Sequence, residues 1–268
     1  ERTTVQLATR TGGGTGFGLG PISAAAGAIH EVARSDPLPG PVVGVDVVGD
    51  TAFVAANDAG LVAIDLSDES RPRYVGRSDA SGLASDVAVV GQTAFVAVAD
   101  LGLVAFDVGD PTRMREIGRM ELEGGASWLL AGNGYVLVAP GPLRVVDVRD
   151  PAAPAAIAEI PDTNHFAPGE AAISGTTLYV LRDGCRIEIF DVGDPSSPRL
   201  VGSLASPITY FWQIWADGER MFVQDAEKLT VYDVSEPTSP VAVGSVAFDC
   251  EPKDAALTAG KVVVSCAA

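Results

Sequence analysis

The chain is poor in the residues that bind transition metals. Its 268 residues include two histidines and three cysteines. Because zinc, copper and iron centres are built mainly from imidazole and thiolate ligands, this supply argues against a multi-histidine or clustered-cysteine site. Calcium needs only oxygen ligands and stays open as a cofactor, with Asp86, Glu170 and Asp254 as candidate ligands. We expect no other cofactor.

Positive charge and long apolar runs are also scarce. Lys and Arg number 18 against 35 Asp and Glu, which gives a net charge of −17. Nucleic acids and anionic lipids attract basic patches, so we expect small molecules or proteins as partners and no nucleic acid. No apolar stretch approaches the about 18 residues that span a bilayer, so we expect no membrane insertion. The first residues show no basic segment before an apolar one, so we expect no secretion signal in the chain as given.

Two of the cysteines lie near the C-terminal end. Cys250 and Cys266 flank a predicted hairpin turn, and a turn centred on residues 259–260 places Cys266 opposite Lys253. Cys250 would have to curl back from the preceding loop to meet Cys266. A Cys250–Cys266 disulfide and three free thiols therefore both remain open.

What the chain does have is a repeat. Five times a short apolar run ends in Asp before a turn, as in LVAFDVGDP at residues 103–111 and IEIFDVGDP at residues 187–195. The steps between the repeated aspartates are 42, 40, 44 and 42 residues. Four short strands and their turns occupy such a period in a β-propeller blade. The repeated residues are Asp65, Asp107, Asp147, Asp191 and Asp233.

The first copy shows the four strands of one blade. Residues 43–48 are small and β-branched, Gly49 and Asp50 form a hairpin turn, and residues 51–56 return. A second turn leads to LVAIDL at residues 61–66, and a fourth strand follows near residues 74–77. Glycine permits the positive φ that tight hairpins need. The copy therefore predicts a four-stranded antiparallel blade.

The last copy is incomplete, because residues 250–268 hold only the first two strands of a blade. An isolated hairpin would expose an unpaired edge, so other strands must complete it. Residues 4–9 (TVQLAT) have strand composition, and residues 31–36 (EVARSD) echo residues 74–79 (YVGRSD). We predict an all-β, six-bladed β-propeller of four-stranded antiparallel blades, closed by these N-terminal strands. A short helix over residues 23–34 is the alternative, since Ala and Glu favour helices.

The predicted ring is one domain over residues 1–268. Residues 1–40 supply closing strands and a Gly-rich connection, residues 41–249 five full repeats, and residues 250–268 the half repeat. The glycine run at residues 12–20 has the spacing of a nucleotide-binding loop. It lacks the strand before and the helix after, so we interpret it as a connection.

The repeat resembles the LVIVD-repeat family of bacterial and archaeal β-propellers. The likeness lies in the LVAID-like strand, the V-x-D-P-x-x-P turn and the following V-G, and it is clearest in DVGDPSSPRLVGS at residues 191–203. It covers about residues 43–268. The third copy departs from it with Pro140-Gly141-Pro142. The resemblance implies the fold and an exported location, extracellular, periplasmic or at the cell surface.

The two ends of the predicted blades differ. Strand direction alternates, so connections between blades gather at one end and the Asp-Pro turns at the other. The Asp-Pro turns are nearly identical, and we expect the repeated Asp of each to hydrogen-bond its own turn. The inter-blade connections differ from one another, which favours them as the place of function. They are residues 79–86, 121–127, 161–170, 206–213 and 249–254.

These irregular connections carry acidic and aromatic side chains. Crowded carboxylates raise one another's pKa, and His165 titrates near neutral pH. Aromatic faces suit a sugar ring, an amine or an apolar chain. Surface hydration by the acids and core packing by the aromatics are the alternatives. The candidate catalytic residues are Asp86, His165, Glu170 and Asp254, and the candidate ligand-binding residues are Trp128, Tyr210, Trp212, Gln213, Glu251 and Lys253.

Two functions follow from this reading. The first is an exported or surface-associated recognition module that binds a small molecule or a protein partner on the irregular loops. The second is an enzyme, a lyase, isomerase or hydrolase, in which His165 and a carboxylate transfer protons in an acidic, aromatic pocket.

Overall fold

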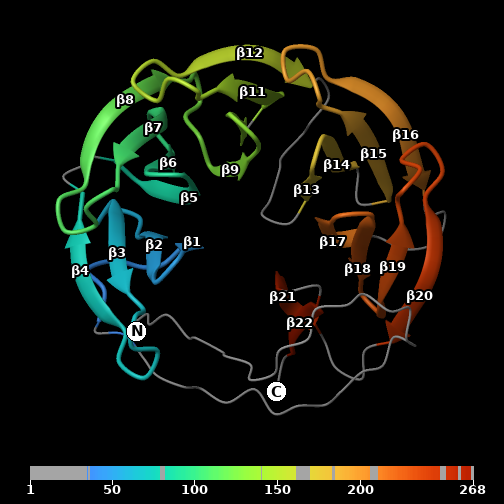
Figure 1. The fold of residues 1–268 in the computed structure, drawn as a ribbon, viewed down its shortest axis with the longest axis horizontal. Helices are drawn as coiled ribbons and strands as arrows, with labels where there is room; N and C mark the ends of the chain where they lie inside the picture. Colours follow the sequence, from blue (N-terminus) through green and yellow to red (C-terminus); the bar gives the residue numbers. More distant parts are fainter. Residues whose placement is uncertain are drawn as a thin grey trace. The chain divides into compact units, whose positions relative to one another are not determined.

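The computed structural model describes residues 35, 37–78, 82–139, 141–160, 170–182, 185–205, 211–247, 252–258 and 261–266. For Trp212 and for the last two ranges only the backbone is described. These residues form twenty-two strands (Figure 1). Over the same residues there is no helix that could cross a membrane.

Twenty of the strands form five antiparallel sheets of four strands, which we call blades 1 to 5. Blade 1 contains β1 (Gly44–Val48), β2 (Thr51–Ala55), β3 (Leu61–Asp65) and β4 (Arg73–Arg77). Blade 2 contains β5 (Ala84–Val90), β6 (Thr93–Val98), β7 (Gly102–Asp107) and β8 (Arg115–Glu121). Blade 3 contains β9 (Trp128–Ala131), β10 (Tyr135–Ala139), β11 (Leu143–Asp147) and β12 (Ala155–Ile160).

Blade 4 contains β13 (Ala171–Ser174), β14 (Thr177–Arg182), β15 (Arg186–Asp191) and β16 (Arg199–Ala205). Blade 5 contains β17 (Phe211–Asp217), β18 (Arg220–Asp225), β19 (Lys228–Asp233) and β20 (Val241–Ala247). The last hairpin, β21 (Pro252–Thr258) and β22 (Lys261–Cys266), is a two-stranded sheet of its own.

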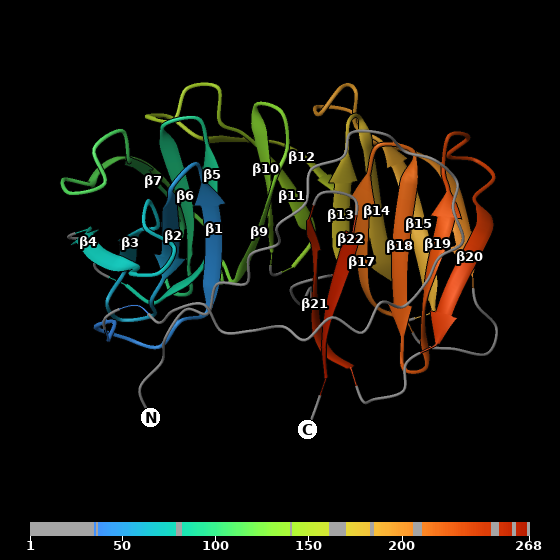
Figure 2. The same ribbon diagram turned by 60° about the horizontal axis from the view of Figure 1, so that its bottom comes forward.

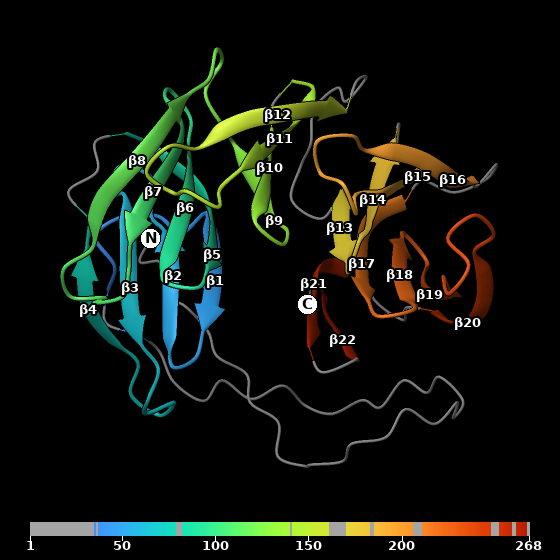
Figure 3. The same ribbon diagram turned by 45° about the horizontal axis from the view of Figure 1, so that its top comes forward.

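The blades fall into two compact units. Blades 1 to 3 belong to the first unit, and blades 4 and 5 with the last hairpin belong to the second. Within the first unit, β5 lies between β1 and β9 (Figure 2). Within the second, β13 is the neighbour of β17 (Figure 3). The first strand of each blade therefore lies against the first strand of the next blade within its unit.

The cores lie between the faces of neighbouring blades. Phe53 and Leu61 of blade 1 pack with Val96 and Phe106 of blade 2, and all four are buried. A matching cluster joins blade 4 to blade 5. A strand covered on both faces needs apolar residues at every position, which explains runs such as TAFVAV in β6.

The predicted hairpin turns are confirmed, two of them with a shift of one residue. Gly49, Gly91 and Gly175 open two-residue turns with φ values of 58°, 62° and 59°, which favour glycine. In blades 3 and 5 the sequence predicts turns at residues 132–133 and 217–218, and the structure has them one residue later, because Gly132 bonds to Tyr135 and Asp217 pairs with Arg220.

The last hairpin departs from its predicted register at one point. Asp254 pairs with Ser265 as a turn at residues 259–260 requires, but Cys266 pairs with Pro252 and not with Lys253. The extra residue of a β-bulge, Lys253, causes the difference. Cys185 is a free thiol, whereas Cys250 and Cys266, for which a disulfide and free thiols were both open, lie outside the described side chains.

The structure describes five complete blades, not the six predicted. The proposed closing strands at residues 4–9 and 31–36, the helix alternative and the Gly-rich run lie outside the described residues, except for Ser35, which is not in a strand. Blade 3 forms the same four-stranded sheet as its neighbours although its second turn carries prolines. Gly141 in that turn has a φ of 89°, which glycine tolerates.

Candidate functional site

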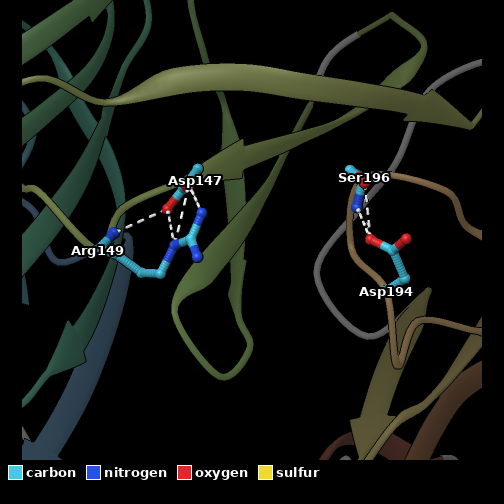
Figure 4. Close-up of polar contacts among 4 residues, drawn as sticks. All are labelled: Asp147, Arg149, Asp194 and Ser196. Carbon is cyan, nitrogen blue, oxygen red and sulfur yellow. Dashed lines mark hydrogen bonds and ion pairs between the residues drawn. The ribbon is translucent and has the colours of Figure 1, made fainter.

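The repeated aspartates stabilise turns, as the sequence predicts. In each of the five blades the carboxylate accepts a hydrogen bond from the backbone N–H two residues ahead, at distances of 2.9 to 3.1 Å. Figure 4 shows Asp147 with Arg149, and Asp194 of the following Asp-Pro turn with Ser196. The Arg149 side chain lowers the pKa of Asp147 to about 2. These acids are part of the scaffold and not of a site.

The inter-blade connections lie at the predicted end of the blades. Leu83, just before β5, accepts a hydrogen bond from the N–H of Ala99 in the turn that precedes β7. Asn57, in the corresponding turn of blade 1, exchanges two backbone hydrogen bonds with Ala84 of blade 2. The irregular connections of a blade and its second turn are therefore neighbours.

Five of the candidate residues occupy one repeated position. It lies four residues before the closing pair of the first hairpin, and we call it the inner-strand position. The residue at this position differs between neighbouring blades, and β5, β17 and β21 share a β-bulge just before it. These three strands therefore keep the same local geometry while the side chain varies. The occupants are Gly44, Asp86, Trp128, Glu170, Gln213 and Asp254.

Asp86 is held between two neighbouring blades. Its carboxylate accepts hydrogen bonds from the N–H groups of Val87 and Leu129, both at 2.9 Å. A Cβ atom at Gly44 of blade 1 would lie 2.6 Å from Asp86 Oδ1, so glycine leaves room for the carboxylate. Burial raises the pKa of Asp86 to about 6, with a smaller contribution from the charge of Asp46.

The other candidates differ in their surroundings. Trp128 begins β9 of blade 3 and is 4% exposed. Glu170 directly precedes β13, and Gln213 lies on β17 opposite Gln224; both are partly exposed. His165, Tyr210 and Glu251 lie outside the described residues, as do the side chains of Trp212, Lys253 and Asp254. Among the described side chains, no group of three His, Cys, Asp or Glu could hold a metal ion.

Blade 5 carries a hollow of about 480 Å³ that the sequence did not predict. Phe211 begins β17, Asp225 ends β18 and Lys228 begins β19, so the hollow lies at the end of the irregular connections. Phe211, Val223 and Tyr232 also belong to the core cluster shared with blade 4. The lining residues are Phe211, Val223, Asp225, Lys228, Thr230, Tyr232, Ala242, Val243, Gly244 and Ser245.

Asp225 is the most buried charge of this hollow. Its side chain is 4% exposed, and Oδ1 accepts the N–H groups of Glu227 and Lys228, both at 2.8 Å. These bonds fix the carboxylate across the turn between β18 and β19. Burial, and then the charge of Asp225, raises the pKa of Tyr232. No ion pair within the described residues joins Lys228 to Asp225.

The hollow coincides with a break in the repeat. In blades 1 and 2 the corresponding positions hold buried apolar side chains. In blade 4 they hold Arg182 and Glu188, joined by an ion pair of 2.8 Å. The hollow residues Asp225, Thr230 and Tyr232 replace Ala56, Val62 and Ile64 of blade 1 and Val98, Val104 and Phe106 of blade 2.

Comparison with protein families matches the LVIVD repeat to residues 39–80, 81–121, 169–206 and 210–247, more than half of the chain. The chain belongs to the LVIVD-repeat family. The matches cover blades 1, 2, 4 and 5, whereas blade 3 folds as an LVIVD blade without a match of its own. No curated protein matches this LVIVD-repeat chain.

Solved structures resemble the LVIVD-repeat chain at the level of the fold. A protein from Lactobacillus plantarum is 15% identical with a TM-score of 0.68, over 87% of this chain and 80% of that one. A functionally unknown protein from Desulfotomaculum acetoxidans is 15% identical with a TM-score of 0.66, over 83% and 75%. BamB from Moraxella catarrhalis is 11% identical with a TM-score of 0.50, over 83% and 66%. These likenesses support a propeller-like repeat fold and nothing finer.

Aligned LVIVD repeats would have located the hollow. The strand VAFD of blade 2 reads TVYD in blade 5, and the preceding strand ends in Asp225 where blade 2 has Val98. The strands read as uniform scaffold in each single copy, whereas the connections visibly differ. The informative differences lie within the strands, one or two residues from the connections.

Proposed function

We propose that this LVIVD-repeat protein is a recognition module that binds a small molecule or a protein partner at the end of its irregular connections. The observation that carries the proposal is the hollow of blade 5. It has the volume of a small-molecule site, and it mixes apolar walls with a few fixed polar groups. Its Asp225, Thr230 and Tyr232 stand where blades 1 and 2 have buried apolar side chains.

Binding is a better account of the described groups than catalysis. A pKa of about 6 suits a proton-transfer residue, and Asp86 is the described acid that has it. Both of its carboxylate oxygens, however, accept backbone N–H groups that stabilise β5 and its contact with β9. The enzyme alternative needs a free carboxylate beside a base, and Asp86 is engaged in the scaffold.

The same proposal includes a sixth blade and an exported location. β21 and β22 would be its inner half, completed by residues 4–9 and 31–36. Val45 and Val47 of β1 support this, since these apolar side chains are 50% and 51% exposed. Residues 1–268 would then form one domain. The location, extracellular, periplasmic or at the cell surface, rests on the family resemblance, and no nucleic acid or membrane insertion is expected at a net charge of −17.

A fragment screen by protein-observed NMR tests the binding site. Ser245→Trp on β20 places an indole at the rim of the hollow and should abolish binding of the fragments found. Ser203→Trp is the matched control, because Ser203 opposes Glu188 on blade 4 as Ser245 opposes Thr230 on blade 5. Fragments that bind both variants equally, or a screen without ligands at the hollow, would contradict the proposal.

Deletion of residues 1–36 tests the sixth blade. If these residues complete the last sheet, the truncated protein should lose protection from hydrogen exchange in β21 and β22. Unchanged protection of both strands would show that they need no N-terminal partner.

A further inference from the structure

We infer that the hollow of blade 5 recognises a zwitterion that carries an ammonium group, a carboxylate and an apolar side chain, as a free apolar or aromatic α-amino acid does. The inference rests on the proposed function and names its ligand class. Three separate features of the hollow support it.

The first feature is a buried and oriented carboxylate. Asp225 is 4% exposed, and two backbone N–H groups engage Oδ1. No described residue hydrogen-bonds to Oδ2. Such a carboxylate is already largely removed from water in the unliganded protein, so binding adds little further desolvation cost. This favours a charge-assisted hydrogen bond with a cationic group. Asp225 is thus the ammonium-binding element.

The second feature is an ammonium group at the edge of the same hollow. Lys228 lines it and is exposed, and no ion pair within the described residues engages its Nζ. A ligand with only a positive charge would be repelled by Lys228, and a ligand with only a negative charge by Asp225. A zwitterion satisfies both charges, so the pair selects against singly charged ligands.

The third feature is the apolar and aromatic wall. Phe211 and Val223 are buried at 6% and 2% exposure, and Tyr232 is half-buried beside them. The phenol ring of Tyr232 suits an apolar ligand and offers one hydroxyl. Val243 is 45% exposed and would be covered by a ligand side chain. The wall therefore favours an aromatic or branched side chain over a hydrophilic one.

Isothermal titration calorimetry with three matched probes tests this class. L-phenylalanine carries both charges, phenethylamine lacks the carboxylate, and 3-phenylpropanoate lacks the ammonium group. We expect L-phenylalanine to bind roughly tenfold or more tightly than either of the others, because each charge contributes a charge-assisted hydrogen bond.

Two substitutions assign the charges. Asp225→Asn keeps an oxygen for the turn and should weaken phenylalanine and phenethylamine roughly tenfold but leave phenylpropanoate unchanged or improved. Lys228→Gln should weaken phenylalanine and phenylpropanoate and spare phenethylamine. Asp217→Asn and Glu227→Gln, both exposed and outside the lining, are the controls and should change none of the three.

The outcomes separate this inference from the proposed function. Equal affinity of the three probes, or full affinity in both Asp225→Asn and Lys228→Gln, overturns the zwitterion class. The zwitterion class is also overturned if none of the three probes binds while the fragment screen finds other ligands that are sensitive to Ser245→Trp. In each of these cases the proposed binding function stands. Absence of probes and of fragments together overturns both. Unchanged melting temperatures of the variants show that a lost affinity is not a lost fold.

Discussion

The carboxylate of Asp86 on β5 accepts a hydrogen bond from the N–H of Leu129 on β9, at 2.9 Å and 43 residues away. Asp46 on β1 does the same for Val89 on β5, at 2.7 Å and again 43 residues away. Each innermost strand of the first unit is thus tied to the next by one acid. The two hydrogen bonds add a directional contact to the non-directional apolar packing between neighbouring blades.

The contribution of Asp86 to the free energy of unfolding should depend on pH. Its folded pKa of about 6 lies above the usual 3.8, so its contribution to stability is fully present below pH 3.8 and is lost as the pH rises through 6. The full loss is about 3 kcal/mol at about 1.4 kcal/mol per pK unit. Asp86→Asn cannot ionise, so its stability relative to the wild type should improve by about 2–3 kcal/mol between pH 4 and pH 7.5. Urea unfolding at both pH values measures this, and a difference that does not change with pH contradicts it.

The Asp46 link should contribute to stability directly. Asp46→Ala leaves the N–H of Val89 without its acceptor and should lower the free energy of unfolding by about 1–3 kcal/mol. Amide hydrogen exchange at Val89 should accelerate as well. Glu69→Ala, at an exposed turn position, serves as the control and should stay within about 0.5 kcal/mol of the wild type. An unchanged exchange rate at Val89 would refute the link.

Substituting alanine at two adjacent glycines should lower the free energy of unfolding by very different amounts. Gly124 and Gly125 both have positive φ, at 84° and 71°. A Cβ at Gly124 meets nothing within 4 Å, whereas one at Gly125 would lie 1.6 Å from the carbonyl oxygen of Ala99. Gly124→Ala should therefore cost about 1 kcal/mol of backbone strain, and Gly125→Ala more than about 3 kcal/mol. Denaturant unfolding measures the loss of stability in each variant. Similar losses would mean that residue 125 does not approach the carbonyl oxygen of Ala99 so closely.

Replacing each of two buried tyrosines with phenylalanine should change the free energy of unfolding in opposite directions. The hydroxyl of Tyr135 is buried without a hydrogen-bond partner in the described part of the chain, and Tyr135 is 3% exposed. Tyr135→Phe should therefore raise stability by up to about 1 kcal/mol. Tyr179 hydrogen-bonds to the side chain of Thr177, so Tyr179→Phe should lower it by about 1 kcal/mol. Thermal unfolding compares them, and a loss in both variants would indicate a missing partner for Tyr135.

The candidate site was only partly predictable. The sequence analysis found Asp86, Glu170, Gln213 and Asp254 as polar residues near the connections, and the structure places them at one repeated position. It did not find Asp225, Lys228 or Tyr232, because each lies in a strand that reads as regular scaffold. Burial of a carboxylate beside a hollow depends on the neighbouring blade, which no single repeat contains.

By itself, the sequence determined the blades. Glycine-led hairpins and the turn-forming aspartates act through bonds between residues a few positions apart, so the four strands of each copy and nearly all their turns follow from local pattern. The tertiary structure alone decided the roles of the acids. Asp86 follows a β-bulge of β5 and bonds to the next blade, whereas Asp225 ends a regular strand and faces a hollow, and the adjacent face sets how much water each carboxylate keeps.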